Sequence, residues 1–212
     1  MPREHSSGAP PSPATTLAVI LGASKWPRWK GEAAATLGGG RQFLSSALGF
    51  KEYLCDPRGF NLPAENLLWL FDTDAGPDDL DRELSVFLKR RTAARGRGGE
   101  PARDLLIYYV GHGGFEGGDS DYYLMIRNSR PDGLGVSSLR MVSLARTIKE
   151  AARSLRCYLI LDCCFAARAV EPLMSPAADL AAARTESAFE QYPNRGTALL
   201  CSSAKDKASQ AP

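Results

Sequence analysis

Residues 104–114 read DLLIYYVGHGG: the apolar run at 104–110 predicts a strand, and a loop with a histidine set among glycines is expected to follow it. Residues 157–164 read CYLILDCC: a second apolar run, at 157–161, predicts another strand, and an aspartate and two cysteines come at its end. Runs that are apolar at every position are typical of strands in a parallel sheet, because helices cover both of its faces. Active residues of such sheets gather beyond the carboxyl ends of the strands, so the ends of these two runs predict a site.

Three more apolar runs predict buried strands at residues 17–22, 67–71 and 197–201, and a hairpin strand is expected at 122–126. Helical periodicity lies between them, at residues 41–48 with Gly49 as the expected stop, from Pro77 to Arg91, and at 141–155. Strands that alternate with helices predict an α/β protein, with a mainly parallel central sheet between two layers of helices.

The chain has 212 residues, of which 44% are hydrophobic and 24% are charged. These values fit one globular domain of α/β size and exclude a wholly disordered or collagen-like chain. The formal net charge is only +2, from 26 basic and 24 acidic residues, which argues against a general electrostatic nucleic-acid binder. No apolar run approaches the roughly 18 residues of a membrane span, so we expect no membrane partner.

Residues 1–15 are rich in proline, serine and glycine and are expected to be a disordered leader, before a domain at 16–205 and a tail at 206–212. The N-terminus has no apolar segment of the kind that signal peptides contain. The five cysteines are an odd number and include an adjacent pair, which argues against a disulfide framework. We therefore expect reduced thiols and a cytoplasmic protein.

His112 is the candidate base, because the other histidine, His5, lies in the expected leader. Neighbouring parallel strands would place it across from Cys163 and Cys164, and this pairing makes a thiolate nucleophile. Glycines on both sides of the histidine are expected to let the backbone turn sharply around the imidazole. The amide of Gly113, together with that of the nucleophilic cysteine, is expected to form an oxyanion hole.

The segment YYVGHGG at 108–114, followed about fifty residues later by LILDCCFA at 159–166, resembles the caspase-like cysteine peptidases. This clan contains caspases, metacaspases and paracaspases, and the resemblance is closest to its compact bacterial members. It extends over about residues 17–205 and includes FDTDAGPDDL and the terminal ALLCSSAKD. It implies a three-layer α-β-α caspase-like fold and an endopeptidase that forms an acyl-enzyme on a protein or peptide substrate, without a cofactor or metal. Bacterial relatives often occur beside sensor or scaffold modules, so a regulatory or scaffold protein is a candidate partner.

The metacaspase pattern Asp-x-Cys matches Asp162 and Cys164, with Cys163 as the variable residue between them. Side chains alternate along a strand, so positions 162 and 164 are expected on one side of the sheet and position 163 on the other. We therefore assign Cys164 as the nucleophile and His112 as its base, with the amides of Gly113 and Cys164 as the oxyanion hole. Cys163 is the alternative nucleophile.

Asp162 is the expected substrate-binding residue. Metacaspases and paracaspases have an aspartate at this place and cut after arginine or lysine, so the resemblance implies the same preference here. A carboxylate at the base of the pocket would pair with a cationic P1 side chain. The sequence departs from the family at Asn128, where metacaspases often have an aspartate, and at residues 165–167, where FAA replaces His-Ser-Gly. The structural alternative for Asp162 is a carboxylate that caps backbone amides at the strand end.

Three other interpretations compete with a peptidase. A catalytically silent caspase-fold module for signalling or assembly is the main one, and the intact His112 and Cys164 argue against it. A flavodoxin-like nucleotide binder needs a glycine-rich phosphate loop after its first strand, and LGASKWPRW is a poor one. A zinc site of His112, Cys163, Cys164 and Cys201 is disfavoured, because adjacent cysteines rarely direct both sulfurs to one tetrahedral ion.

Residues 165–195 lack a clean period and are expected to be a mobile loop that carries self-processing sites at Arg168, Arg184 and Arg195. Arg168 lies too close to the nucleophile to be cut in cis. Related proteins continue beyond the fifth strand with elements that complete the pocket, so the resemblance also raises the expectation that the C-terminal part of the small subunit is missing here.

Overall fold

The computed structural model describes residues 10–38, 40–93, 100–115, 122–165, 177–191 and 197–201; some side chains within these ranges, those of Cys164 and Phe165 among them, are not described. The strands are β1 (Thr16–Gly22), β2 (Leu67–Phe71), β3 (Asp104–Phe115), β4 (Tyr122–Leu124), β5 (Leu139–Arg140), β6 (Arg156–Phe165) and β7 (Thr197–Cys201). The helices are α1 (Gly31–Thr36), α2 (Gly40–Cys55), α3 (Pro77–Ala93), α4 (Leu134–Ser137), α5 (Met141–Ala152) and α6 (Ala177–Gln191), with 3-10 turns η1 (Pro13–Thr15) and η2 (Ala64–Asn66).

The body of the sheet consists of parallel strands in the order β2-β1-β3-β6-β7, with β3 at the centre. β4 pairs antiparallel with the end of β3, and β5 pairs antiparallel with β4. The α/β class and the mainly parallel sheet that the sequence predicts are confirmed. Each predicted strand is found, and the expected hairpin strand corresponds to β4.

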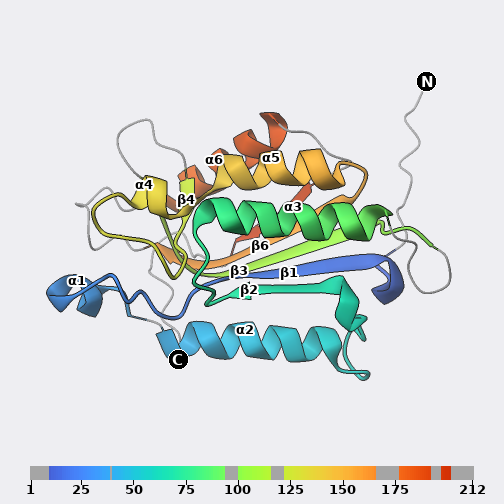
Figure 1. Ribbon diagram of the computed structural model, residues 1–212, viewed down its shortest axis with the longest axis horizontal. Helices are drawn as coiled ribbons and strands as arrows, with labels where there is room; N and C mark the ends of the chain where they lie inside the picture. The colour runs from blue at the N-terminus through green and yellow to red at the C-terminus, as the bar shows by residue number, and fades with distance from the viewer. Residues whose placement is uncertain are drawn as a thin grey trace.

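Helices cover both faces of the sheet, with α2 on one face and α3, α5 and α6 on the other (Figure 1). Alternate residues of β1 supply the two cores. Leu17, Val19 and Leu21 lie in the core on the α3 and α5 side, and Ala18 and Ile20 lie in the core under α2. A strand covered in this way must be apolar at every position, which explains the continuous runs in the sequence.

α2 is longer than expected, because it continues through Gly49 instead of ending there. Its C-terminal turns bury Leu54 and place the Phe50 ring beside that of Tyr108, with the centroids 4.4 Å apart. A glycine inside a helix costs about 1 kcal/mol relative to alanine. Full burial of one large apolar side chain contributes about 1.5–3 kcal/mol, so the packing of these turns outweighs the glycine.

β3 and β6 are also longer than expected, and the Gly-His-Gly-Gly segment belongs to β3 and not to a following loop. β3 remains paired with β6 as far as Gly113, and residues 113–115 pair with β4. These pairings join segments that are far apart in the sequence, so the local hydropathy pattern could not reveal them. His112 is therefore held within a paired strand.

The expectation of a structureless segment at 165–195 is wrong in its second half, where α6 forms. Alanine has the highest helix propensity, and this segment is rich in it. Ala181, Thr185 and Phe189 are buried at intervals of one helical turn, which gives α6 a face that packs beside α5. The run appeared aperiodic because alanine and threonine carry a weak hydropathy signal.

Of the expected self-processing sites, Arg184 lies inside α6. Peptidases bind their substrates as extended chains, so cutting after Arg184 would require α6 to unfold. Arg168 and Arg195 lie outside the described residues, as does the expected tail at 206–212.

The expected leader ends earlier than the sequence suggests, because residues 13–15 form the turn η1 and Thr15 is buried. The Thr16 hydroxyl donates to the carbonyl of Ser12 at 2.7 Å, which fixes the entry into β1. Residues 1–9 lie outside the described residues.

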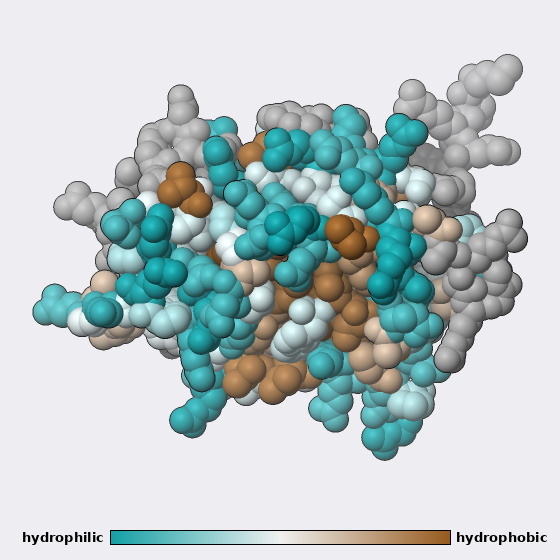
Figure 2. Space-filling view, viewed as in Figure 1, coloured by the Kyte–Doolittle hydropathy of each residue, from teal (hydrophilic) through white to brown (hydrophobic). Residues whose placement is uncertain are grey.

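Hydrophilic residues cover most of the face seen in Figure 2, and hydrophobic residues show between α3 and α2, where the edge strand β2 lies. Leu67, Leu68 and Trp69 of β2 are only half-buried. The Lys51 ammonium of α2 lies over the Trp69 ring, 4.7 Å from its centroid, so a charged side chain covers part of this edge. Of the helices described, none is long and apolar enough to cross a membrane.

Leu84→Ala in α3 should lower the free energy of unfolding by about 2–5 kcal/mol, because Leu84 is only 2% exposed and packs on the sheet. Val86 on the same helix is 60% exposed. Val86→Ala should therefore change the free energy of unfolding by less than about 0.5 kcal/mol. Urea unfolding followed by circular dichroism measures both values, and equal losses in the two variants would contradict the orientation of α3.

Candidate active site

β3 and β6 run side by side, with His112 opposite Cys164 and Val110 opposite Asp162. Neighbouring strands of a sheet lie about 4.8 Å apart, so these backbones are in direct contact. The candidate residues thus come from adjacent strands at the carboxyl edge of the sheet, which is where the sequence predicts them. The side chain of Cys164 is outside the described ones, so only its backbone position is known.

Asp162 and Cys163 point to opposite sides of the sheet, as their alternation predicts. Asp162 accepts a hydrogen bond from Tyr108, whose ring lies in the core under α2. Cys163 is 4% exposed and belongs to the core on the α3 and α5 side, where the Tyr122 hydroxyl lies 3.0 Å from its Sγ. Cys163 therefore faces away from His112, which lies on the α2 side.

The imidazole of His112 is 6% exposed and packs against Trp26 and Phe43, with ring centroids 4.8 and 5.0 Å away. Its Nε2 atom lies within hydrogen-bond distance of two backbone carbonyl oxygens, those of Leu37 and Gly38, the second at 3.3 Å. A carbonyl oxygen only accepts, so Nε2 carries the proton and donates. Nδ1 is then the basic nitrogen of the ring.

The segment between β1 and α2 contributes two backbone carbonyls that the sequence does not predict, although the tryptophans and basic residues at 25–30 make it a candidate either for lining a cleft or for a surface loop. The sequence at 23–40 has the composition of an ordinary loop, yet the two carbonyls that hold His112 belong to it. Every residue has a backbone carbonyl, so no side-chain pattern marks these two. The available signal was the tryptophan pair after the first strand. Trp26 packs on His112, and the Trp29 indole N–H donates to the carbonyl of Ser129 at 3.0 Å.

The glycines beside His112 are required for close packing and not, as expected, for a sharp turn. Gly111 has a φ of +155°, and a Cβ atom there would lie 2.9 Å from the Tyr109 hydroxyl. A Cβ atom at Gly113 would lie 2.2 Å from the Tyr122 hydroxyl. Larger residues at either position would have to displace a tyrosine from the core.

Asp162 is half-buried, and the Tyr108 hydroxyl donates to its Oδ2 at 2.8 Å. Burial, and after it the hydrogen bond with Asp162, raises the pKa of Tyr108 above its usual value, so the phenol remains a donor at neutral pH. The side-chain amide of Asn128 donates to the backbone carbonyl of Asp74. Asn128 is thus engaged with the segment that follows β2.

A cavity of about 450 Å³ lies beside His112. Leu37 and Gly38 line it and also hold the imidazole, so the cavity and the His112 site share a wall. Arg127 stands at its rim, with its Nε atom 2.7 Å from the Asp74 carboxylate. His112 itself is not among the residues that line this cavity, so the cavity adjoins the imidazole through the Leu37 and Gly38 segment.

Within the described parts of the chain, no three His, Cys, Asp or Glu side chains lie close enough to hold a metal ion. The zinc alternative depends on Cys164 and Cys201, whose side chains are outside the described ones. What the structure does bring together is an imidazole of fixed tautomer and a backbone position that carries a thiol. These groups are suited to proton transfer and nucleophilic attack.

No protein-family model and no curated protein matches the sequence. Among solved structures, the chain is similar to protein GSU0716 from Geobacter sulfurreducens, with 17% sequence identity and a TM-score of 0.44. The match covers 71% of this chain and 50% of that chain, so the chain spans half the length of this neighbour. At this level the likeness carries no argument about fold family or function.

Cys157 and Cys163 should remain unmodified when the native protein is treated with iodoacetamide at pH 8. Both are buried, and burial raises the pKa of the Cys157 thiol to about 12, so only about one molecule in ten thousand holds this thiolate at pH 8. Cys55 is half-exposed and should react, which makes it the control within the chain. Peptide mass spectrometry before and after unfolding in urea measures this, and rapid native modification of Cys163 would contradict the register of β6.

Proposed function

We propose that the protein is a cysteine endopeptidase of caspase-like fold, in which His112 and Cys164 form the catalytic pair. The observation that carries the proposal is the register of β3 with β6, which lays the backbone of Cys164 beside His112. The fixed tautomer of His112 supports it, because Nε2 donates to backbone carbonyls and Nδ1 is left as the base. Cys163 faces the opposite core, which favours Cys164 as the nucleophile.

The reaction proceeds by proton transfer and acyl transfer. The thiol of Cys164 gives its proton to Nδ1 of His112, and the thiolate attacks the carbonyl carbon of the scissile peptide. The amides of Gly113 and Cys164 donate to the oxyanion that forms. The C–N bond then breaks, the imidazolium gives its proton to the leaving amine, and an acyl-enzyme remains. Water, deprotonated by His112, releases the acid product and the thiol.

The carbonyls of Leu37 and Gly38 have the orienting role that a third side chain has in many catalytic triads. A thiol ionises near pH 8.5, far below a hydroxyl, so a correctly oriented imidazole is sufficient to activate it. Trp26 and Phe43 enclose the ring and limit its rotation. The pair therefore needs no carboxylate behind the histidine.

Asp162 is proposed to select arginine or lysine at P1. Asp162 lies on the same side of the sheet as His112 and two residues before Cys164. The hydrogen bond from Tyr108 orients its carboxylate. A cationic P1 side chain would pair with this carboxylate, and an acidic one would meet an uncompensated like charge. Asn128 leaves the pocket with fewer carboxylates than metacaspases often have, so the charge of Asp162 carries the preference.

Cys164→Ala and His112→Ala should each abolish hydrolysis of fluorogenic peptides, because each removes one of the two reacting groups. Cys163→Ser should keep most of the activity, since this side chain lies in the opposite core. Circular dichroism of all three variants checks that the fold is retained. Full activity in Cys164→Ala together with loss in Cys163→Ser would reverse the assignment of the nucleophile.

Substrates with Arg or Lys at P1 should be cut on the order of a hundred-fold faster than the matched Asp substrate, measured as kcat/KM. Asp162→Asn removes the charge and keeps an acceptor for Tyr108, so it should lower this ratio at least about ten-fold. Tyr108→Phe is the matched control, because it removes the hydrogen bond and keeps the charge. A wild-type protein that cuts only after Asp, or equal losses in the two variants, would contradict the role of Asp162 as a charge selector.

A further inference from the structure

We propose that Tyr109 is a positioning residue for His112, and that its hydroxyl holds the main chain of His112 from the face of the sheet opposite to the imidazole. The inference rests on the proposed function, because it concerns how the base of that reaction is oriented. It adds a residue that takes no part in bond making or bond breaking.

The hydroxyl of Tyr109 makes a hydrogen bond shared between two backbone carbonyls. It donates to the carbonyl of His112 at 2.5 Å and to that of Met125 at 2.9 Å. The amide of Met125 donates to the same His112 carbonyl at 2.8 Å. The Tyr109 hydroxyl therefore fixes the peptide group between His112 and Gly113. It also links this group to Met125, which directly follows β4.

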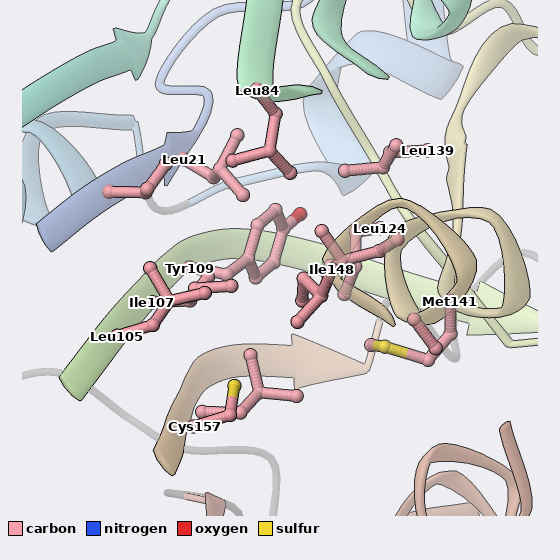
Figure 3. Packing of buried hydrophobic residues seen from close by; sticks show 14 of the residues in the cluster. Leu21, Leu84, Leu105, Ile107, Tyr109, Leu124, Leu139, Met141, Ile148 and Cys157 are labelled. Carbon is pink, nitrogen blue, oxygen red and sulfur yellow. The ribbon is translucent and has the colours of Figure 1, made fainter. Parts of the chain in front are cut away.

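The side chain of Tyr109 lies in apolar surroundings, so its hydroxyl contributes to the structure through these two hydrogen bonds. The side chain is fully buried, and Figure 3 shows it among aliphatic residues that include Leu21, Leu84 and Ile148. A phenylalanine would fill the same apolar space, and a buried hydroxyl is costly unless it is hydrogen-bonded. Burial raises the pKa of Tyr109 well above its usual value, so the group remains a donor at every working pH.

Gly111 is what allows the phenol to reach the carbonyl of His112. Tyr109 and Gly111 lie on the same side of β3, and the ring of Tyr109 passes over the position where a side chain at 111 would stand. A Cβ atom there would lie 2.9 Å from the hydroxyl and 3.3 Å from the ring carbon that bears it. The position of the Tyr109 hydroxyl therefore depends on the absence of a side chain at Gly111.

His112 is thus held at two points on opposite faces of the sheet. The carbonyls of Leu37 and Gly38 hold Nε2 at the tip of the ring, and Tyr109 holds the backbone at its root. Together they leave the imidazole one direction in which Nδ1 can point. A reactive group displaced by about 1 Å can lose about a hundred-fold in rate, so the second anchor matters for catalysis.

Tyr109→Phe tests the inference, because it keeps the ring and removes only the donor. In hydrolysis of an Arg substrate, kcat should fall on the order of ten- to a hundred-fold while KM changes by less than about two-fold. The pH profile of Cys164 alkylation should also move toward that of an ordinary thiol, since a misplaced imidazole stabilises the thiolate less.

Thr16→Val is the matched control. Thr16 is also buried and also donates its hydroxyl to a backbone carbonyl, at the opposite end of the sheet. Its urea midpoint should move by an amount similar to that of Tyr109→Phe, with kcat and the alkylation profile unchanged. Gly111→Ala should lower kcat in the same direction by pushing the hydroxyl away, with a larger loss of stability than in Tyr109→Phe, because the added Cβ would lie 2.9 Å from the hydroxyl at a backbone φ of +155°.

A Tyr109→Phe protein that loses stability but keeps the wild-type kcat and alkylation profile would overturn the positioning role. If the proposed function itself is wrong, a different result is expected, and it is seen in the wild-type protein and in His112→Ala without any variant of Tyr109. In that case wild-type Cys164 shows the alkylation profile of an ordinary thiol and His112→Ala does not change it, and both proposals are then wrong.

Discussion

Arg156 binds both carboxylate oxygens of the buried Asp104, at 2.7 and 3.0 Å, where the ladder between β3 and β6 begins. A bidentate pair of this kind adds a geometric constraint to the register that the buried apolar faces already favour. The same ladder ends where His112 lies opposite Cys164. Side chains alternate along a strand, so a slip of one residue would exchange every inward and outward position of β6 and could bring Cys163 opposite the histidine. The position of Cys164 opposite His112 thus depends on the same register to which this ion pair contributes at the far end of the two strands.

The two faces of the sheet contribute differently at its carboxyl edge. The face under α2 carries the groups that could meet a substrate, His112 and Asp162. The face under α3 and α5 is packed with apolar side chains. Its polar atoms near the strand ends are the Tyr109 hydroxyl, which donates to the His112 carbonyl, and the Cys163 sulfur, which lies beside the Tyr122 hydroxyl. A strand exposed to solvent on one face would have no buried side chain such as Tyr109 there to hold the main chain of a residue whose side chain lies on the other face. The buried three-layer arrangement therefore supplies rigidity as well as stability.

The sequence predicted the elements whose signal is local. Residues 67–71 are a continuous apolar run and form β2 with these same bounds. Features that depend on distant partners were not predictable in this way: Gly49 continues a helix because later turns pack on the sheet, and β3 extends past Gly111 because β4 and β6 pair with it. In the candidate site, His112 and Asp162 could be predicted from their residue types and their places at the ends of apolar runs. The carbonyls at Leu37 and Gly38 could not, because they are backbone atoms with no distinguishing side chain.

The placement of His112 has a consequence for how the molecule is made. Its ring is held by a segment that precedes it by most of the N-terminal half, and its strand pairs with β6, which is synthesised later. Contacts between such distant segments carry the loop-closure entropy of the intervening chain and form late in folding. In a nascent chain on the ribosome, β3 can pair with β1 and β4 first, but His112 has no strand position opposite it on the β6 side until β6 has emerged and docked. A reaction that needs both strands at this edge therefore cannot begin until β6, near the C-terminal end of the described sheet, has been synthesised and has paired with β3.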